Sequence, residues 1–230
     1  MLYSIQQMST QILLWNEEIE FPEKTYSKVI TIVNEFARKM NQKGQSTGHW
    51  EENRNARKPD YDNKSGKLGE FAAVWFLGIK MGFPSLVPDV EVRPSYQKKF
   101  DTDLPYATKL KKPEFPDCHV KTCSNITASH LTRLTADLQV EVIDKYSWTF
   151  QFGNKSGIGG RDKKIFDDKE DDTPIVFMYY PDPSSMKSIL IATAPCYLLH
   201  EYDLFKEPVK PDLAGLKKCV YYKHLIDFCK

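Results

Sequence analysis

The chain has 230 residues, of which 41% are hydrophobic and 13% aromatic, so it can bury a sizeable core and fits one large domain. Its 32 Lys and Arg residues against 31 Asp and Glu residues give a formal charge of +1, which excludes the globally basic surface of many nucleic-acid-binding proteins. Five cysteines without a CxxC pair predict neither a zinc site nor a disulfide framework.

The N-terminal segment lacks the basic start and long apolar run of a secretion signal. No stretch reaches the roughly 18 apolar residues of a membrane-spanning helix. We therefore expect a soluble, unsecreted protein of a reducing cytoplasm, with no membrane partner.

In chain order, apolar residues recur at helical spacing from Tyr26 to Met40 and predict a core-packed helix. The stretch from Asn41 to Lys67 is polar and turn-rich, and it predicts a long loop. The following segment, Leu68 to Met81, is apolar on nearly every side and predicts a buried helix with Glu70 as its lone acid.

Short segments rich in β-forming residues then alternate with prolines, glycines and Asp/Ser clusters, which predicts strands joined by loops. A glycine-rich, charged connector from 153 to 172 interrupts them, and the tail offers short elements that close over the sheet. Helices before a strand-dominated middle predict an α/β or α+β domain with a mixed sheet, and we favour α/β. The expected strands are Val90–Arg93, Cys118–Thr122, Val140–Ile143, Trp148–Phe152, Ile175–Tyr180 and Ser188–Ala192.

The strongest chemical signal lies in two motifs, FDTDL at 100–104 and FPDCHVKTC at 115–123. Strand alternation places Asp117, His119 and Lys121 on one face, and Cys118 and Val120 toward the core. Hydrolysis of a phosphodiester with Mg²⁺ needs oxygen ligands, a way to activate water, and cationic help for the transition state. Two acids and a lysine on adjacent strands supply these groups.

This arrangement resembles the PD-(D/E)XK nuclease superfamily, which has a helix Glu, a strand Asp, a (D/E)-x-K strand and often a later Gln. The resemblance covers roughly Lys67 to Ala192. It implies catalytic roles for four residues, with Asp101 as a second candidate for the strand acid. They are Glu70 in GKLGEFAA, Asp103 in FDTDL, Lys121 in HVKT and Gln151 in SWTFQF.

The resemblance also implies a restriction-endonuclease-like fold, a mixed β-sheet core flanked by helices with an N-terminal helical segment. Residues 1–230 then form a single nuclease domain, with an N-terminal helical segment and basic loop (1–66), a catalytic core (67–192) and a C-terminal closing segment (193–230). The implied activity is metal-dependent DNA hydrolysis that leaves 5′-phosphate ends. Mg²⁺ is the expected cofactor, with Mn²⁺ as a substitute, and double-stranded DNA the expected partner.

A restriction-type or phage-encoded endonuclease, in a bacterial or phage-infected host cytoplasm, is the expected setting. Restriction-like enzymes often form homodimers, although no segment of the sequence marks an interface.

The sequence departs from the family pattern at His119, where an acid is usual. The implied metal ligands are therefore Asp103 and Glu70 with either Asp117 or His119. Imidazole binds divalent metals but suits softer ions better than Mg²⁺. We favour Asp117, although it lies about 13 Å along the strand from Lys121, at ~3.3 Å per residue.

Two basic segments are candidates for contact with the DNA backbone. The loop before the Glu70 helix carries Arg54, Arg57 and Lys58 near aromatic residues, and the glycine-rich connector carries Lys155 and Arg161. The alternative for both segments is an ordinary solvated loop.

Two other interpretations stay open at this stage. One is a nuclease-fold protein with a decayed centre that binds DNA or assists assembly, which the histidine at 119 makes credible. The other is an unrelated cytoplasmic α/β binding module in which these residues are ordinary surface groups.

Overall fold

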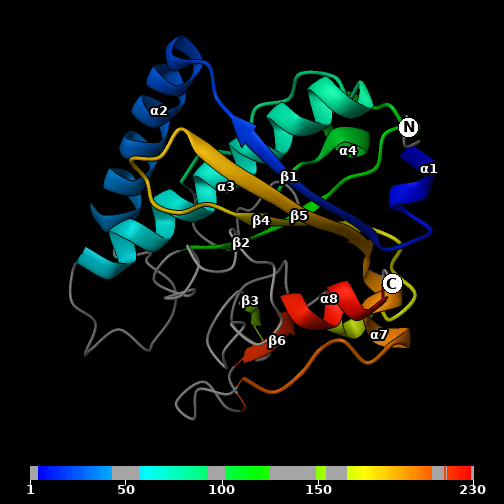
Figure 1. Cartoon of the computed structure of the whole chain (residues 1–230). Coiled ribbons are helices and arrows are strands. Elements are labelled where there is room, and N and C mark those ends of the chain that lie inside the picture. The colour runs from blue at the N-terminus through cyan, green and yellow to red at the C-terminus, as the bar shows by residue number, and fades with distance from the viewer. Residues whose placement is uncertain are drawn as a thin grey trace.

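The computed structural model describes residues 5–42, 57–92, 102–124, 149–153, 165–208, 215 and 217–228 (Figure 1). Within these ranges the chain is a mixed α/β protein. Its elements are α1 (Ile5–Met8), β1 (Leu13–Glu20), α2 (Glu23–Gln42), α3 (Arg57–Met81), α4 (Tyr106–Leu110), β2 (His119–Cys123), β3 (Thr149–Gly153), β4 (Pro174–Tyr179), β5 (Lys187–Pro195), α7 (Cys196–Glu201), β6 (Lys217–Tyr221) and α8 (Tyr222–Phe228).

Four of the strands form a mixed sheet in the order β1-β5-β4-β2. Strands β2 and β4 are parallel, with Val120 opposite Val176, whereas β4 and β5 and also β5 and β1 are antiparallel. Strands β3 and β6 form a separate antiparallel pair. The expectation of a mixed sheet with helices is therefore confirmed, and β2 is the last strand of the described sheet.

Each face of this sheet carries its own apolar core. One core packs side chains of α2, α3 and α4 against alternate residues of the strands, including Val120 and Val176. The other core joins the opposite strand face, including Phe177, to β3, β6, α7 and α8. Figure 1 shows the result as three layers, with α2 and α3 on one side of the sheet and β3, β6, α7 and α8 on the other.

Helix α2 contains the predicted helix and extends it at both ends. Val29, Val33 and Ala37 are buried at intervals of four residues, so one stripe of this helix faces the core. Pro22 precedes the first helical residue, where a missing N–H is tolerated, and its carbonyl accepts hydrogen bonds from the backbone N–H groups of Thr25 and Tyr26.

Helix α3 corrects one expectation. It begins at Arg57, so residues 57–67, predicted as part of a loop, are helical. Pro59 lies in its first turn, where proline is tolerated. The helix ends where Gly82 takes a left-handed φ of 67° and the N–H of Phe83 donates to the carbonyl of Leu77 at 3.2 Å, which satisfies an end carbonyl.

Four of the six expected strands are present, with ends that differ from the expected ones by one to three residues. Strands β2, β3, β4 and β5 contain or nearly match four of the predicted segments. The described residues of the segment that begins at Val90 form no strand, and Val140–Ile143 lies outside the described residues. Strand β1 was not predicted. It carries a bulge, in which Asn16 has a φ of 47°, and this bulge breaks the alternation of its side chains.

No helix in the described ranges is both long enough and apolar enough to cross a lipid bilayer. Helix α3 instead buries most of its large apolar side chains in the core, among them Leu68, Phe71, Phe76 and Leu77.

We predict that Leu77→Ala in helix α3 lowers the free energy of unfolding by about 2–5 kcal/mol, because the Leu77 side chain is fully buried and its loss leaves a cavity. Ile79→Ala in the same helix is the matched control. Ile79 is 61% exposed, so its replacement should change stability by less than ~0.5 kcal/mol. Urea unfolding of both variants measures the difference, and equal losses would contradict the packing described for this helix.

Candidate active site at the edge of strand β2

Asp103 lies beside the outer edge of β2 and is held there by backbone and side-chain hydrogen bonds. The N–H groups of Asp103 and Leu104 donate to the carbonyl of Cys118 at 3.1 and 2.9 Å, and the N–H of Cys118 donates back to Leu104 at 3.0 Å. The next outward N–H of β2 belongs to Val120. It donates to a side chain instead of a backbone carbonyl, namely to Oδ2 of Asp103 at 2.9 Å. Asp103 is only 9% exposed, so this acid is fixed in place.

Glu70 is held by a buried ion pair within helix α3. The ammonium of Lys67, three residues earlier, donates to both carboxylate oxygens of Glu70 at 2.9 and 2.7 Å. It also donates to the backbone carbonyl of Asp89 at 2.9 Å and lies 4.7 Å from the ring centre of Phe36. Lys67 and Glu70 are 6% and 8% exposed, so their charges compensate each other in a place that water reaches little.

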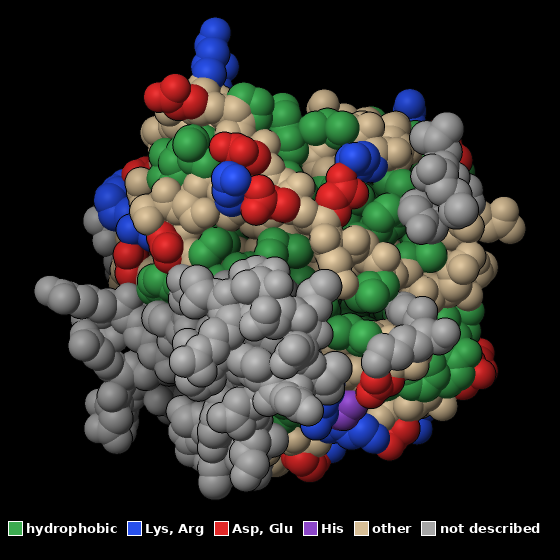
Figure 2. All heavy atoms as spheres, viewed as in Figure 1, with side chains coloured by type: hydrophobic (Ala, Val, Ile, Leu, Met, Phe, Trp, Pro, Cys, Tyr) green, Lys and Arg blue, Asp and Glu red, His purple; other side chains and the backbone are tan. Residues whose placement is uncertain are grey.

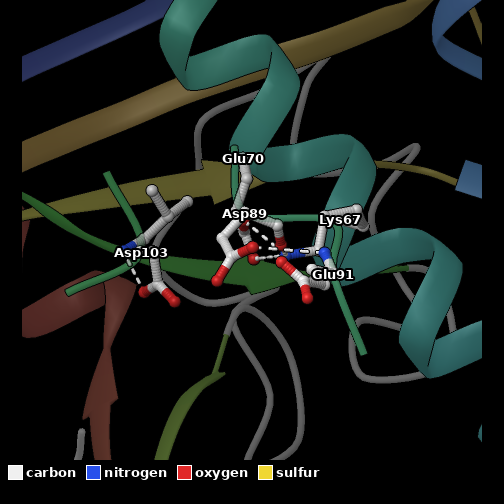
Figure 3. A network of polar contacts seen from close by, with 6 residues as sticks. Lys67, Glu70, Asp89, Glu91 and Asp103 are labelled. Atoms are coloured by element: carbon white, nitrogen blue, oxygen red, sulfur yellow. Dashed lines mark hydrogen bonds and ion pairs between the residues drawn. The ribbon is translucent and has the colours of Figure 1, made fainter. Parts of the chain in front are cut away.

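Figure 3 shows how the acids lie relative to one another. Glu70 and Lys67 extend from α3, the segment with Asp89 and Glu91 passes beside them, and Asp103 lies to one side. The carboxylate of Asp89 accepts the backbone N–H of Glu91 at 3.1 Å. Sequence reasoning missed Lys67, Asp89 and Glu91; only the spacing of three between Lys67 and Glu70 could have indicated the first of them.

Lys121 and His119 lie on the other face of β2. In this parallel pair Lys121 is opposite Phe177 and His119 is opposite Ile175, and both partners belong to the core beneath β3. The Lys121 ammonium lies 4.7 Å from the ring centre of Phe152 in β3. His119 is 1% exposed, so the predicted polar face is covered. The prediction that Cys118 and Val120 face a core is confirmed.

The two halves of the candidate site therefore approach β2 from opposite sides. Helix α3 with Glu70 covers one face, Lys121 projects from the other, and Asp103 lies at the edge between them. Side chains on opposite faces of one strand can act on a common substrate only at its edge. The edge beside Asp103 is thus where a shared centre can form.

Asp117 precedes β2 and is bound to helix α4. Its carboxylate accepts the backbone N–H of Thr108 at 3.2 Å and the Thr108 hydroxyl at 2.5 Å. Next to it, burial raises the pKa of the Cys118 thiol, and the charges of Asp117 and Asp103 raise it further. This thiol therefore stays protonated and is not a nucleophile.

Gln151 lies in the middle of β3, half-buried and opposite Cys219 of β6. Its neighbours Phe150 and Phe152 enter the core on the Lys121 side of β2, so strand alternation turns the Gln151 side chain to the other face of β3, away from Lys121. Arg57 and Lys58 open helix α3, and their side chains lie outside the described residues. Asp101, Arg54, Lys155 and Arg161 also lie outside them.

The donor types at this edge fit a hard divalent cation, because the acids near β2 offer carboxylate oxygens of the kind that Mg²⁺ prefers. Asp103 and Glu70 come from different elements and could each supply one. Among the described residues, however, no three His, Cys, Asp or Glu side chains converge closely enough to hold an ion together. The acids therefore match Mg²⁺ in the type of ligand atom they offer, and the match does not extend to a complete set of ligands among the described residues.

Comparison of the chain with protein-family models, with curated proteins and with solved structures finds no match.

We predict that Lys67→Met lowers the free energy of unfolding by about 3–5 kcal/mol, because it leaves the Glu70 charge buried without its ammonium partner. Lys64→Met is the matched control: this lysine pairs with Asp60 at 2.8 Å on the more exposed part of the same helix, and its loss should cost at most ~1 kcal/mol.

The double variant Lys67→Met/Glu70→Leu removes both charges and should recover most of the lost stability. Chemical denaturation of the four proteins checks this. Equal stability of the two lysine variants would show that the buried pair carries no special weight.

Proposed function

We propose that this chain is a metal-dependent DNA nuclease, most simply an endonuclease, of the PD-(D/E)XK type. One observation carries the proposal: the Asp103 carboxylate is fixed against the backbone of β2 at Val120, the residue between His119 and Lys121. The acid and the strand that were paired on motif order alone thus lie side by side. Glu70 on the adjoining helix α3 supports the same proposal.

The residues that would hold a Mg²⁺ ion are Asp103 and Glu70, together with Asp117 or His119; Mn²⁺ is the expected substitute. When bound, such an ion supplies Lewis acidity at the scissile phosphate and lowers the pKa of a coordinated water.

The protein's own contribution is positioning and charge. Asp103 is immobilised by its bond to the N–H of Val120, so its carboxylate is oriented before any ligand arrives. Lys121 keeps its ammonium near the face of Phe152, and from there it can orient a water or stabilise negative charge on the phosphate.

Two observations favour a second candidate, a protein that keeps the nuclease fold but has a decayed centre and serves in DNA binding or assembly. The family's second acid is replaced by His119, which is buried. Both oxygens of Glu70 are bound by Lys67. Cleavage of plasmid DNA that requires metal distinguishes the two candidates.

Double-stranded DNA remains the proposed substrate, with a 5′-phosphate as the product end. In Figure 2 the described side chains of this face mix acidic and basic residues, so they form no single basic patch there. The proposed contacts with the DNA backbone are those of Arg54, Arg57, Lys58, Lys155 and Arg161. A restriction-type or phage setting, a cytoplasmic location and a homodimer belong to the same proposal.

We predict that Lys121→Ala abolishes cleavage of supercoiled plasmid in Mg²⁺ while the fold and much of the DNA affinity persist. The lysine is half-buried at a sheet edge, so its loss removes a charge rather than a piece of the core. Lys109→Ala, an exposed lysine of α4, is the control and should cut at the wild-type rate. Cleavage by Lys121→Ala at the wild-type rate would show that the site is assigned wrongly.

A second comparison decides between Asp117 and His119. If Asp117 is the ligand, Asp117→Ala should lose nearly all activity, His119→Ala should lose little, and Mg²⁺ should serve at least as well as Mn²⁺. If His119 is the ligand, the losses should reverse and Mn²⁺ should be preferred, because imidazole favours transition metals. Asp117→Ala could also act by loosening the contact between Asp117 and helix α4. Thr108→Val tests this effect alone, because it removes the hydroxyl that donates to Asp117 and keeps the carboxylate.

A further inference from the structure

Helix α3 and strand β2 approach each other most closely at Gly69 and Thr122. A Cβ atom placed on Gly69 would lie 2.0 Å from Oγ1, 2.9 Å from Cγ2 and 3.0 Å from Cβ of Thr122. Atoms do not approach that closely, so a side chain at residue 69 requires the Thr122 side chain, or the helix and the strand themselves, to shift. The Thr122 hydroxyl is enclosed in this contact and has no hydrogen-bond partner among the described residues.

Other glycines of the same helix have no comparable neighbour. A Cβ on Gly66 would meet nothing within 4 Å, and one on Gly78 would meet only the carbonyl of Phe83 at 3.8 Å. Glycine lowers helix stability relative to alanine, so a glycine inside a helix calls for a reason. At residue 69 the reason is visible, because glycine alone allows the observed spacing.

Both partners of this contact are the covalent neighbours of predicted site residues. Gly69 precedes Glu70 in α3, and Thr122 follows Lys121 in β2. Val120, whose N–H is bound by Asp103, points to the same face of β2 as Thr122. A separation of α3 from β2 at this point therefore moves Glu70 away from Asp103 and from the edge of the strand.

We propose that Gly69 and Thr122 are positioning residues of the active site, whose close contact sets the distance between the Glu70 helix and the strand that carries Lys121. This inference rests on the proposed nuclease function. Neither residue contacts the substrate. Each acts through its neighbour, and the spacing of the two elements, rather than the chemistry of the two side chains, is what the site requires.

The test compares Gly69→Ala, Thr122→Ala, the double variant and Gly66→Ala in the intact protein. Plasmid cleavage is measured over a range of Mg²⁺ and DNA concentrations, and each rate is corrected for the folded fraction obtained from thermal unfolding. Gly66→Ala is the matched control, because it adds the same methyl group one turn earlier in the helix, into open space.

We expect Gly69→Ala to lower kcat about 100-fold and to raise the Mg²⁺ concentration for half-maximal rate, with little change in KM for DNA, as for a misplacement on the order of 1 Å. Gly66→Ala should behave like the wild type. The double variant should recover at least about 10-fold of the lost kcat, because Thr122→Ala removes the two nearest atoms and leaves only the Cβ at 3.0 Å.

The inference is overturned if Gly69→Ala has the same kcat and Mg²⁺ requirement as Gly66→Ala. It is also overturned if unfolded protein accounts for the whole loss of kcat in Gly69→Ala and adding Thr122→Ala restores none of it. If Gly69→Ala does not fold, Thr122→Ile tests the same contact from the strand side, and it should show the same loss of kcat and the same shift in Mg²⁺ requirement. Wild-type protein that shows no metal-dependent cleavage overturns the proposed function and this inference together, whereas active wild type with an unaffected Gly69→Ala overturns the inference alone.

Discussion

The burial of helix α3 against the sheet is the constraint on which the rest of this structure depends. Its residues 67–73 are buried without interruption, so the helix cannot turn a polar side to water along that stretch. Two consequences follow at adjacent residues. The charge of Glu70 must be compensated inside the protein, which Lys67 accomplishes. The residue that faces Thr122 must be the smallest one, which places glycine at 69. Packing thus dictates the surroundings of the one buried carboxylate among the described side chains of this helix.

Because the sheet is covered on both faces, the chemistry of β2 is divided between two layers. Val120 and Thr122 belong to the helical layer, whereas His119, Lys121 and Cys123 belong to the layer of β3 and β6. Asp103 joins these layers, since it reaches the strand from its edge and bonds to the backbone rather than to either face. Asp103 is therefore the acid through which the edge of β2 is linked to the chain segment before helix α4.

The sequence predicted the parts of the fold in which one periodicity dominates. The apolar segments that became α2, β2, β4 and β5 were found, and so was the mixed sheet. The first turns of α3 were missed because their polar residues resemble a loop, and β1 was missed because the bulge at Asn16 breaks its alternation. For the candidate site, alternation correctly grouped His119 with Lys121 and Cys118 with Val120, whereas Asp117 precedes the strand and is bound to α4. Alternation cannot tell which layer covers a face, so the burial of His119, the separation of Lys121 from the Glu70 helix and the pairing of Lys67 with Glu70 could be learned only from the packed structure.

The bond between Asp103 and Val120 also affects whether another strand can add to the edge of β2. The last strand of a sheet offers backbone groups to which a strand of another molecule can add, and natural proteins block such edges. Here Leu104 occupies the groups of Cys118, and the Asp103 carboxylate occupies the next outward N–H and adds a negative charge. The same acid therefore leaves one backbone donor fewer at this edge for a second strand to bind. Selection against strand addition alone can therefore retain an acid at residue 103, whether or not that acid has a second use.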